Sequence, residues 1–189
     1  VDEAKLQYRD RLNQGVKDDL WWMADGNGAL RLAIARRGED FVLVLQENLV
    51  FRDVMTLGSD TDLDPVGLSL DVRTMYALTD AGRGQRELVE YDLGRKAVGR
   101  TLFSRPGVDV EHVLFDAQRT PIGVQFYEGG LLVSEYFQPE DARLGALLAK
   151  AFPGRMVRVA DRSRDGRHVV LDVDAADHPS QLYHLDTVK

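Results

Sequence analysis

The sequence contains no cysteine, and this absence excludes a disulfide scaffold, a thiolate metal site and a cysteine nucleophile together. No apolar run approaches the roughly 20 residues of a membrane-spanning helix. Residues 1–5 also lack the basic start and the apolar stretch of a signal peptide. The 24 Lys and Arg residues are outnumbered by 31 Asp and Glu residues, whereas a nucleic-acid-binding surface is usually basic. We therefore expect neither a membrane nor a nucleic acid as a partner.

The 189 residues are 44% hydrophobic, which is enough for a folded core and excludes low-complexity disorder. A compact chain of this length buries roughly 70% of the surface that its unfolded form exposes. The chain begins with Val1 rather than Met, so we expect a processed protein or, in preference, a piece cut from a longer one. The composition is compatible with a cytoplasmic and with a periplasmic location.

An internal repeat runs through the chain. Ser69-Leu70-Asp71-Val72-Arg73 and Ser163-Arg164-Asp165-Gly166-Arg167 share the pattern Ser-x-Asp-x-Arg, and each precedes an apolar stretch. In both copies a second aspartate, Asp92 or Asp186, follows the first by 21 residues. Weaker copies begin around Asp25 and Asp116, so that the four leading aspartates are spaced by 46, 45 and 49 residues.

A unit of about 47 residues built from short strands has the size of one four-stranded propeller blade. The repeat therefore predicts an all-β fold, a partial β-propeller of about four blades, each a four-stranded antiparallel sheet. We expect residues 1–189 to form a single propeller segment. Its expected blades cover residues 19–58, 66–104, 109–138 and 156–189.

Alternating apolar residues and turn-forming residues predict the strands within each unit. The expected strands cover residues 20–24, 29–35, 41–45, 50–57, 66–70, 73–79, 88–93, 97–103, 110–115, 122–127, 131–137, 157–160, 168–173 and 181–186. The fourth unit lacks an outer strand. Leucines at helical spacing, between Pro139 and the stop at Pro153-Gly154, predict one inserted helix over residues 139–152. Residues 2–18 fit a short helix or the end of a preceding blade.

The repeat residues are predicted to be structural. We expect the turn residues Asp25, Ser69, Asp71, Asp116, Ser163 and Asp165 to build Asx-type turns, in which the carboxylates accept backbone N–H groups. Gly67-Leu68-Ser69-Leu70-Asp71 is the nearest match to the nucleophile elbow Gly-x-Ser-x-Gly, but Asp71 replaces the second glycine and no helix follows. We therefore predict no catalytic residue in this chain.

No metal or cofactor site is predicted either. The acidic run from Asp60 to Asp64 lacks the glycine and the distant glutamate of an EF-hand loop, which favours a solvated loop. The four histidines, His112, His168, His178 and His184, match no zincin spacing. Trp21-Trp22 directs one indole to each face of a strand, so at least one is expected in the core and the other is free to stack on a ligand.

The repeat and its flanks resemble the propeller of bacterial prolyl oligopeptidase family serine peptidases, of the dipeptidyl aminopeptidase or acylaminoacyl peptidase type. The resemblance covers about residues 20–189. The segments that carry it are Trp22 to Arg31, Pro106 to Val110, Gly123 to Tyr127, Phe152-Pro153-Gly154 with the Ser163 turn, and His178 to Tyr183. It implies an N-terminal propeller that covers a separate C-terminal α/β-hydrolase domain, filters peptide substrates by size and holds none of the catalytic triad.

Two other functions stay open. The chain could be a stand-alone propeller module that binds protein or peptide partners. It could also be a glycan-active enzyme using Asp172, Asp174 and Asp177, although this chemistry needs two carboxyl groups facing one cleft about 5 to 9.5 Å apart. If the parent ring has seven or eight blades, four units are only part of it. We then expect the isolated fragment to expose apolar sheet faces at its two ends, to leave an unpaired strand edge in unit four, and to self-associate through those faces.

Overall fold

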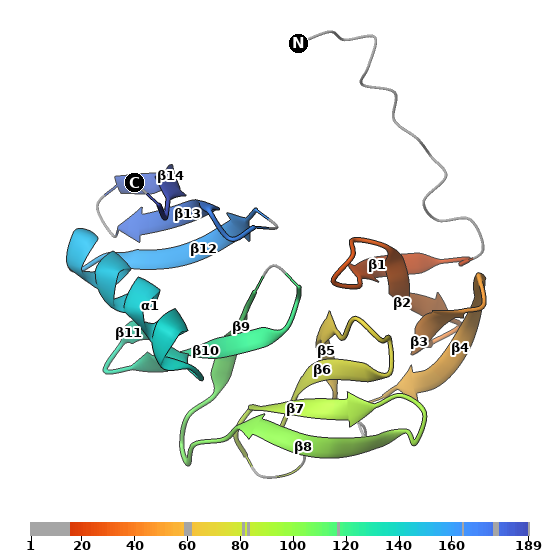
Figure 1. Cartoon of the computed structure of the whole chain (residues 1–189). Helices are drawn as coiled ribbons and strands as arrows, with labels where there is room; N and C mark the ends of the chain where they lie inside the picture. Colours follow the sequence, from red (N-terminus) through yellow and green to blue (C-terminus); the bar gives the residue numbers. More distant parts are fainter. Residues whose placement is uncertain are drawn as a thin grey trace, which may run out of the picture.

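The computed structural model describes residues 16–58, 62–80, 82, 84–116, 118–163, 165–175 and 178–188, without the side chains of residues 175 and 178. Four antiparallel sheets and one helix follow one another along the chain. The sheets are arranged around an arc, with β1, β5 and β9 towards its inner side (Figure 1). This confirms the all-β, part-propeller fold with one inserted helix. The expectation for residues 2–15 lies outside the described residues.

The first two sheets have four strands each, connected in sequence order. The first contains β1 (Asp19–Ala24), β2 (Leu30–Arg37), β3 (Asp40–Glu47) and β4 (Val50–Leu57). The second contains β5 (Asp64–Leu68), β6 (Thr74–Thr79), β7 (Glu87–Asp92) and β8 (Ala97–Phe103). Two-residue turns with positive φ angles join neighbouring strands, as at Asn48-Leu49, because such turns match the twist of antiparallel strands.

The third and fourth sheets have three described strands each, which agrees with the three strands expected in each of these units, while the four-stranded blade holds for the first two sheets. The third contains β9 (Val110–Phe115), β10 (Pro121–Glu128) and β11 (Leu131–Tyr136), and the fourth contains β12 (Met156–Arg162), β13 (His168–Ala175) and β14 (His178–Asp186). β14 begins earlier than expected and includes Pro179, which is tolerated because β14 is an edge strand.

Helix α1 (Pro139–Ala151) follows β11 and confirms the inserted helix predicted over residues 139–152. Proline at the start of the helix and Glu140 and Asp141 in its first turn favour this beginning. Gly145 lies against the ring of Tyr136 on β11, so closely that a Cβ there would overlap the ring. The missing side chain therefore lets α1 pack directly on the third sheet (Figure 1).

The second sheet buries residues on both faces because the first and third sheets cover it. Met75 and Ala77 of β6 belong to the cluster shared with the first sheet, while Tyr76 and Leu78 belong to the cluster shared with the third. This confirms the two-faced alternation predicted for residues 75–78. A further cluster joins Leu148 of α1 to alternate residues of β13.

The two ends of the arc differ from the expectation of uncovered apolar faces. On the outer face of the first sheet, an apolar centre that includes Ala33 and Val44 is buried by Val16, Trp22 and Phe51. On the outer face of the fourth sheet, polar residues predominate. Cross-strand pairing places on that face Met156, Arg158, His168, Val170, Asp172, Asp174, Leu182, His184 and Asp186. For the fourth sheet, the expectation of an apolar outer face is wrong because Asp172 and Asp174 occupy outward positions of β13.

Candidate functional site

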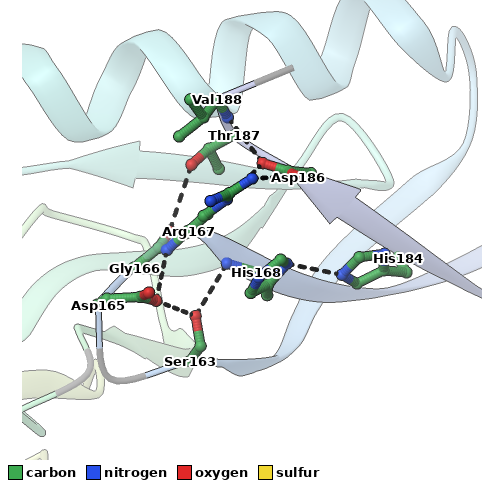
Figure 2. Close-up of polar contacts among 9 residues, drawn as sticks. All are labelled: Ser163, Asp165, Gly166, Arg167, His168, His184, Asp186, Thr187 and Val188. Carbon is green, nitrogen blue, oxygen red and sulfur yellow. Dashed lines mark hydrogen bonds and ion pairs between the residues drawn. The ribbon is translucent and has the colours of Figure 1, made fainter.

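The Ser-x-Asp turn of the fourth sheet is closed by hydrogen bonds among its own residues (Figure 2). The Ser163 hydroxyl donates to Asp165 Oδ1 at 2.6 Å and accepts the N–H of His168 at 2.8 Å. The same carboxylate oxygen accepts the N–H of Arg167 at 3.1 Å. The Ser163 hydroxyl first, and the Arg167 N–H second, lower the pKa of Asp165.

The turn of the second sheet has the same geometry. The Ser69 hydroxyl donates to Asp71 Oδ1 at 2.6 Å and accepts the N–H of Thr74 at 3.0 Å, while Asp71 Oδ1 accepts the N–H of Arg73 at 3.1 Å. The Ser69 hydroxyl is the main cause of the lowered pKa of Asp71. Ser69 is therefore engaged with an acceptor and a backbone donor inside its turn, and no hydrogen bond to a histidine is present there among the described residues.

The first and third sheets carry the turn without serine. Asp25 Oδ1 accepts the N–H groups of Asn27 at 2.8 Å and Ala29 at 3.1 Å, and Asp116 Oδ1 accepts those of Gln118 at 2.9 Å and Thr120 at 2.8 Å. Each carboxylate thus caps the turn between the first two strands of its sheet.

Asp25 has an additional partner, since Arg31 Nε donates to its Oδ2 at 3.1 Å. Asp25 is only 3% exposed. Burial alone would raise the pKa of Asp25, but the N–H donors of the turn and the Arg31 guanidinium together outweigh burial and lower it.

Three of these turns meet at the inside of the arc. A Cβ added to Gly26, in the turn of the first sheet, would overlap the backbone oxygen of Gln118, in the turn of the third. It would also come within 2.6 Å of Leu70 Cδ2, in the turn of the second. The repeated turns therefore form the surface where the first three sheets converge.

The other acidic residues singled out in the sequence are engaged or lie outside the description. Asp62 accepts the N–H of Asp80 at 2.8 Å and Asp64 pairs with Arg86 at 2.6 Å, whereas Asp60 is not described. Within the described ranges, no group of three or more His, Asp or Glu side chains is arranged to hold a metal ion.

The acids considered for glycan chemistry lie on the fourth sheet. Asp172 is paired with Arg158 and accepts the Ser180 hydroxyl. Asp174 lies two residues further along β13, and Asp177 falls outside the described residues.

The histidines are placed apart from one another except for one pair. His168 Nδ1 and His184 Nε2 lie 3.1 Å apart with stacked rings, on the outer face of the fourth sheet (Figure 2). His112 lies on β9 and lines a cavity between the third and fourth sheets. The side chain of His178 is outside the description.

The two tryptophans differ as the strand alternation requires. Trp22 packs edge-on against Phe51 at a centroid distance of 5.2 Å, and its indole N–H donates to Asp19 at 2.6 Å. Trp21 points to the other face and is 43% exposed.

The cavity between the third and fourth sheets has a volume of about 320 Å³. Strands β9 and β10 and Tyr136 of β11 form one wall, and residues 158–162 of β12 form the other. Two of its lining residues, Gln125 and Arg162, carry buried polar atoms that have no hydrogen-bond partner among the described residues. Sequence reasoning missed both residues. The available signal was Gln125 itself, a polar residue flanked by Val124 and Phe126 inside an otherwise apolar strand.

A second, larger hollow of about 1030 Å³ lies between α1 and β11. Its walls include Leu131 and Val133 of β11 and Ala146 and Ala149 of α1.

The structure contains no helix, within its described part, that is long and apolar enough to cross a membrane.

Four antiparallel sheets that pack face to face around an arc define the chain as a β-propeller-type protein. No protein-family model matches the chain, and no curated protein matches its sequence. Among solved structures, the chain is similar to the crystal structure of TolB from Acinetobacter baumannii, with a TM-score of 0.53 and 13% identity. The match covers 90% of this chain and 41% of the TolB chain. At this identity the likeness concerns the propeller fold, and it does not extend to the prolyl oligopeptidase family.

Proposed function

We propose that this chain is a non-catalytic propeller segment of a serine-type oligopeptidase, where it shapes and gates the access of peptides to a separate C-terminal α/β-hydrolase domain. The sequence resemblance to prolyl oligopeptidase family peptidases is one support. The observation that carries the non-catalytic role is the engagement of the repeat residues. Both serine hydroxyls, Ser69 and Ser163, donate to an aspartate two residues further on, so the repeat builds turns and supplies no free nucleophile.

Labelling with a fluorophosphonate probe, which reacts with activated serines, tests the proposal. We expect the 189-residue chain alone to stay unlabelled, while the longer parent protein is labelled at a serine outside residues 1–189. Replacement of Ser69 by alanine in the parent should leave the labelling rate unchanged. Covalent labelling of Ser69, or a parent reading frame without a hydrolase domain, would refute the proposal.

The gating role has a separate test in the parent protein. A segment that filters substrates by size should allow cleavage of a short peptide and exclude the same peptide embedded in a folded protein. Asp25→Asn, which loosens the innermost turn of the first sheet, should raise cleavage of the folded substrate relative to the free peptide. An unchanged ratio, with the first sheet shown by hydrogen exchange to be loosened, would contradict gating.

The alternative is a stand-alone propeller module that binds protein or peptide partners. The observation that favours it is the cavity between the third and fourth sheets, with its unpartnered polar atoms. The reading frame beyond Lys189 discriminates the two functions, because only a peptidase continues into Gly-x-Ser-x-Gly on a strand–turn–helix.

We also propose that the chain by itself associates through its end sheets. The first sheet exposes the large apolar side chains of Phe41, Leu49 and Val50 at the ends of β3 and β4. At the fourth sheet, Leu182 is 73% exposed amid the charged residues of the outer face. Light scattering over a range of concentrations should show a rising mean mass. A constant monomer mass at high concentration would rule the association out.

A further inference from the structure

The cavity between the third and fourth sheets is lined on one side by the third sheet and on the other side by β12 of the fourth. On β10, Val124 and Phe126 pack into the cluster shared with the second sheet. Because side chains alternate along a strand, Gln125 points the other way, towards the fourth sheet, and it lines the cavity. From the opposite wall, Arg162 of β12 faces the third sheet, because it is paired with Val169, a residue of the cluster between α1 and β13.

Gln125 is held in one orientation by a single hydrogen bond. It is 2% exposed, and its Nε2 donates to the Ser134 hydroxyl on β11 at 3.0 Å. Its Oε1 accepts no hydrogen bond from any described residue. A buried amide oxygen without a donor is costly, which points to a donor supplied from the cavity.

Arg162 presents the complementary chemistry. Its Nε is buried and has no acceptor among the described residues. The charged groups that line the cavity are mixed in sign, with Asp116 and Arg119 on the side of the third sheet and Arg158, Asp161 and Arg162 on the side of the fourth, where Arg158 is paired with Asp172. This balance does not select a strongly charged ligand, so the Nε–H is matched by a neutral carbonyl oxygen.

The size and the apolar lining of the cavity restrict the class of ligand that it can bind. Its volume of about 320 Å³ is at the lower end of the range for small-molecule sites. Leu114, Ile122 and Val159 add apolar surface to the lining. A site of this kind accepts a small group with an apolar side chain, one hydrogen-bond donor and one acceptor.

We propose that this cavity binds the backbone of a short peptide. The N–H of a trans peptide group donates to Gln125 Oε1, and its C=O accepts from Arg162 Nε. In a planar trans peptide, the N–H and the C=O point to opposite sides, as the opposite walls of the cavity require. The adjacent apolar side chain packs on Leu114, Ile122 and Val159. The inference does not rest on the presence of a hydrolase domain, because it concerns only residues of this chain.

Binding of the N,N-dimethylamide of N-acetyl-leucine, whose acetyl link carries its only N–H, to the 189-residue chain, followed by backbone amide NMR shifts, tests the proposal. We expect saturable shifts on β10 and β12 with a dissociation constant on the order of 1 mM, as befits a ligand of this size. The ester analogue, in which oxygen replaces the amide nitrogen of the acetyl link, should bind about three- to tenfold more weakly because it cannot donate to Gln125.

Variants locate the site. Gln125→Met keeps the length of the side chain and should weaken binding of the amide about three- to tenfold. The affinity of the ester should be the same for this variant and for the unmodified chain, because the ester makes no hydrogen bond to Gln125. Arg162→Met should weaken binding of both ligands about tenfold or more. Gln181→Met, the same exchange at an exposed position of β14, is the matched control and should leave binding unchanged.

Thermal unfolding and the unperturbed amide spectrum of the first two sheets check that each variant is folded. Non-saturable shifts, equal affinity for the amide and the ester, or unchanged binding by folded Gln125→Met would overturn the proposal and assign the cavity to solvent. None of these outcomes bears on the labelling experiment, so the two proposals fail independently.

Discussion

The ion pair inside the first repeated turn is predicted to stabilise the fold more than the turn itself does. Asp25 and Asp116 make the same two backbone hydrogen bonds, but of the two only Asp25 pairs with an arginine among the described residues, Arg31 at 3.1 Å. Replacement of each aspartate by asparagine keeps an oxygen for the backbone donors. In Asp25→Asn, however, an amide NH₂ replaces the oxygen that faced the guanidinium. The two variants therefore separate the ion pair from the turn.

The expected loss of stability in each variant depends on how far the Asp25–Arg31 pair is buried. A hydrogen bond to a charged group contributes about 1.5–3 kcal/mol, and removing one partner of a fully buried pair costs about 3–5 kcal/mol. The Arg31 side chain is 33% exposed, so water screens part of the interaction. We expect Asp25→Asn to lower the free energy of unfolding by about 2–3 kcal/mol and Asp116→Asn by about 1 kcal/mol or less.

Thermal unfolding measures this difference directly. For a chain of this size, about 1 kcal/mol corresponds to roughly 2–4 °C in the melting temperature, so Asp25→Asn should melt roughly 2–8 °C below Asp116→Asn. A double-mutant cycle with Arg31→Met should assign about 1.5–2 kcal/mol to the pair. Equal losses in the two asparagine variants would refute the argument, because the turn alone would then account for both.

The same pair predicts a pH dependence. Because the folded state lowers the pKa of Asp25, its stabilising contribution is present above the unfolded pKa near 4 and is lost as the pH falls towards the folded pKa. The stability difference between the unmodified chain and Asp25→Asn should therefore be constant near neutral pH and shrink below about pH 4. A difference that persists unchanged at about pH 3 would contradict this assignment.

Three further substitutions probe the first turn and the cavity between the third and fourth sheets. Gly26→Ala should lower the free energy of unfolding by about 1–3 kcal/mol, because its Cβ would overlap the backbone oxygen of Gln118. Gly28→Ala should lower it by about 1–2 kcal/mol, because no atom lies within 4 Å and only the positive φ is strained. Chemical denaturation measures both losses. Gln125→Met removes a buried acceptor that has no donor along with the bond to Ser134, so the free energy of unfolding should change by no more than about 1 kcal/mol. A loss above about 2 kcal/mol in urea unfolding would mean that the amide oxygen is already satisfied within the folded chain.

Much of the fold was predictable because propeller blades are built from local pairings. The strands expected at residues 50–57, 97–103 and 110–115 coincide with β4, β8 and β9. Each is bounded by turn residues and shows an alternation that pairing with the adjacent strand preserves. The helix after β11 was also predictable, because the proline, the acidic first turn and the leucine spacing that predict it over residues 139–152 are local signals, and α1 spans Pro139–Ala151.

The cover of the outer sheet faces at the two ends of the arc could not be predicted from local pairing. Apolar residues on both faces of a strand predict a covered sheet, but they do not say which neighbour covers it. On the first sheet the cover comes from Trp22, Phe51 and Val16 of the same sheet and its flank. On the fourth sheet Asp172 and Asp174 of β13 lie on the outer face, and Asp172 is already paired with Arg158.

The sequence by itself determined the repeat, the strands and the aspartate turns, because each turn is closed by hydrogen bonds between residues no more than six positions apart. The tertiary structure alone decided which side chains face each other across neighbouring sheets. Gln125 and Arg162 are 37 residues apart, and no local pattern relates them. They share a cavity because the twist of each sheet and the packing of α1 leave a space between the third and fourth sheets.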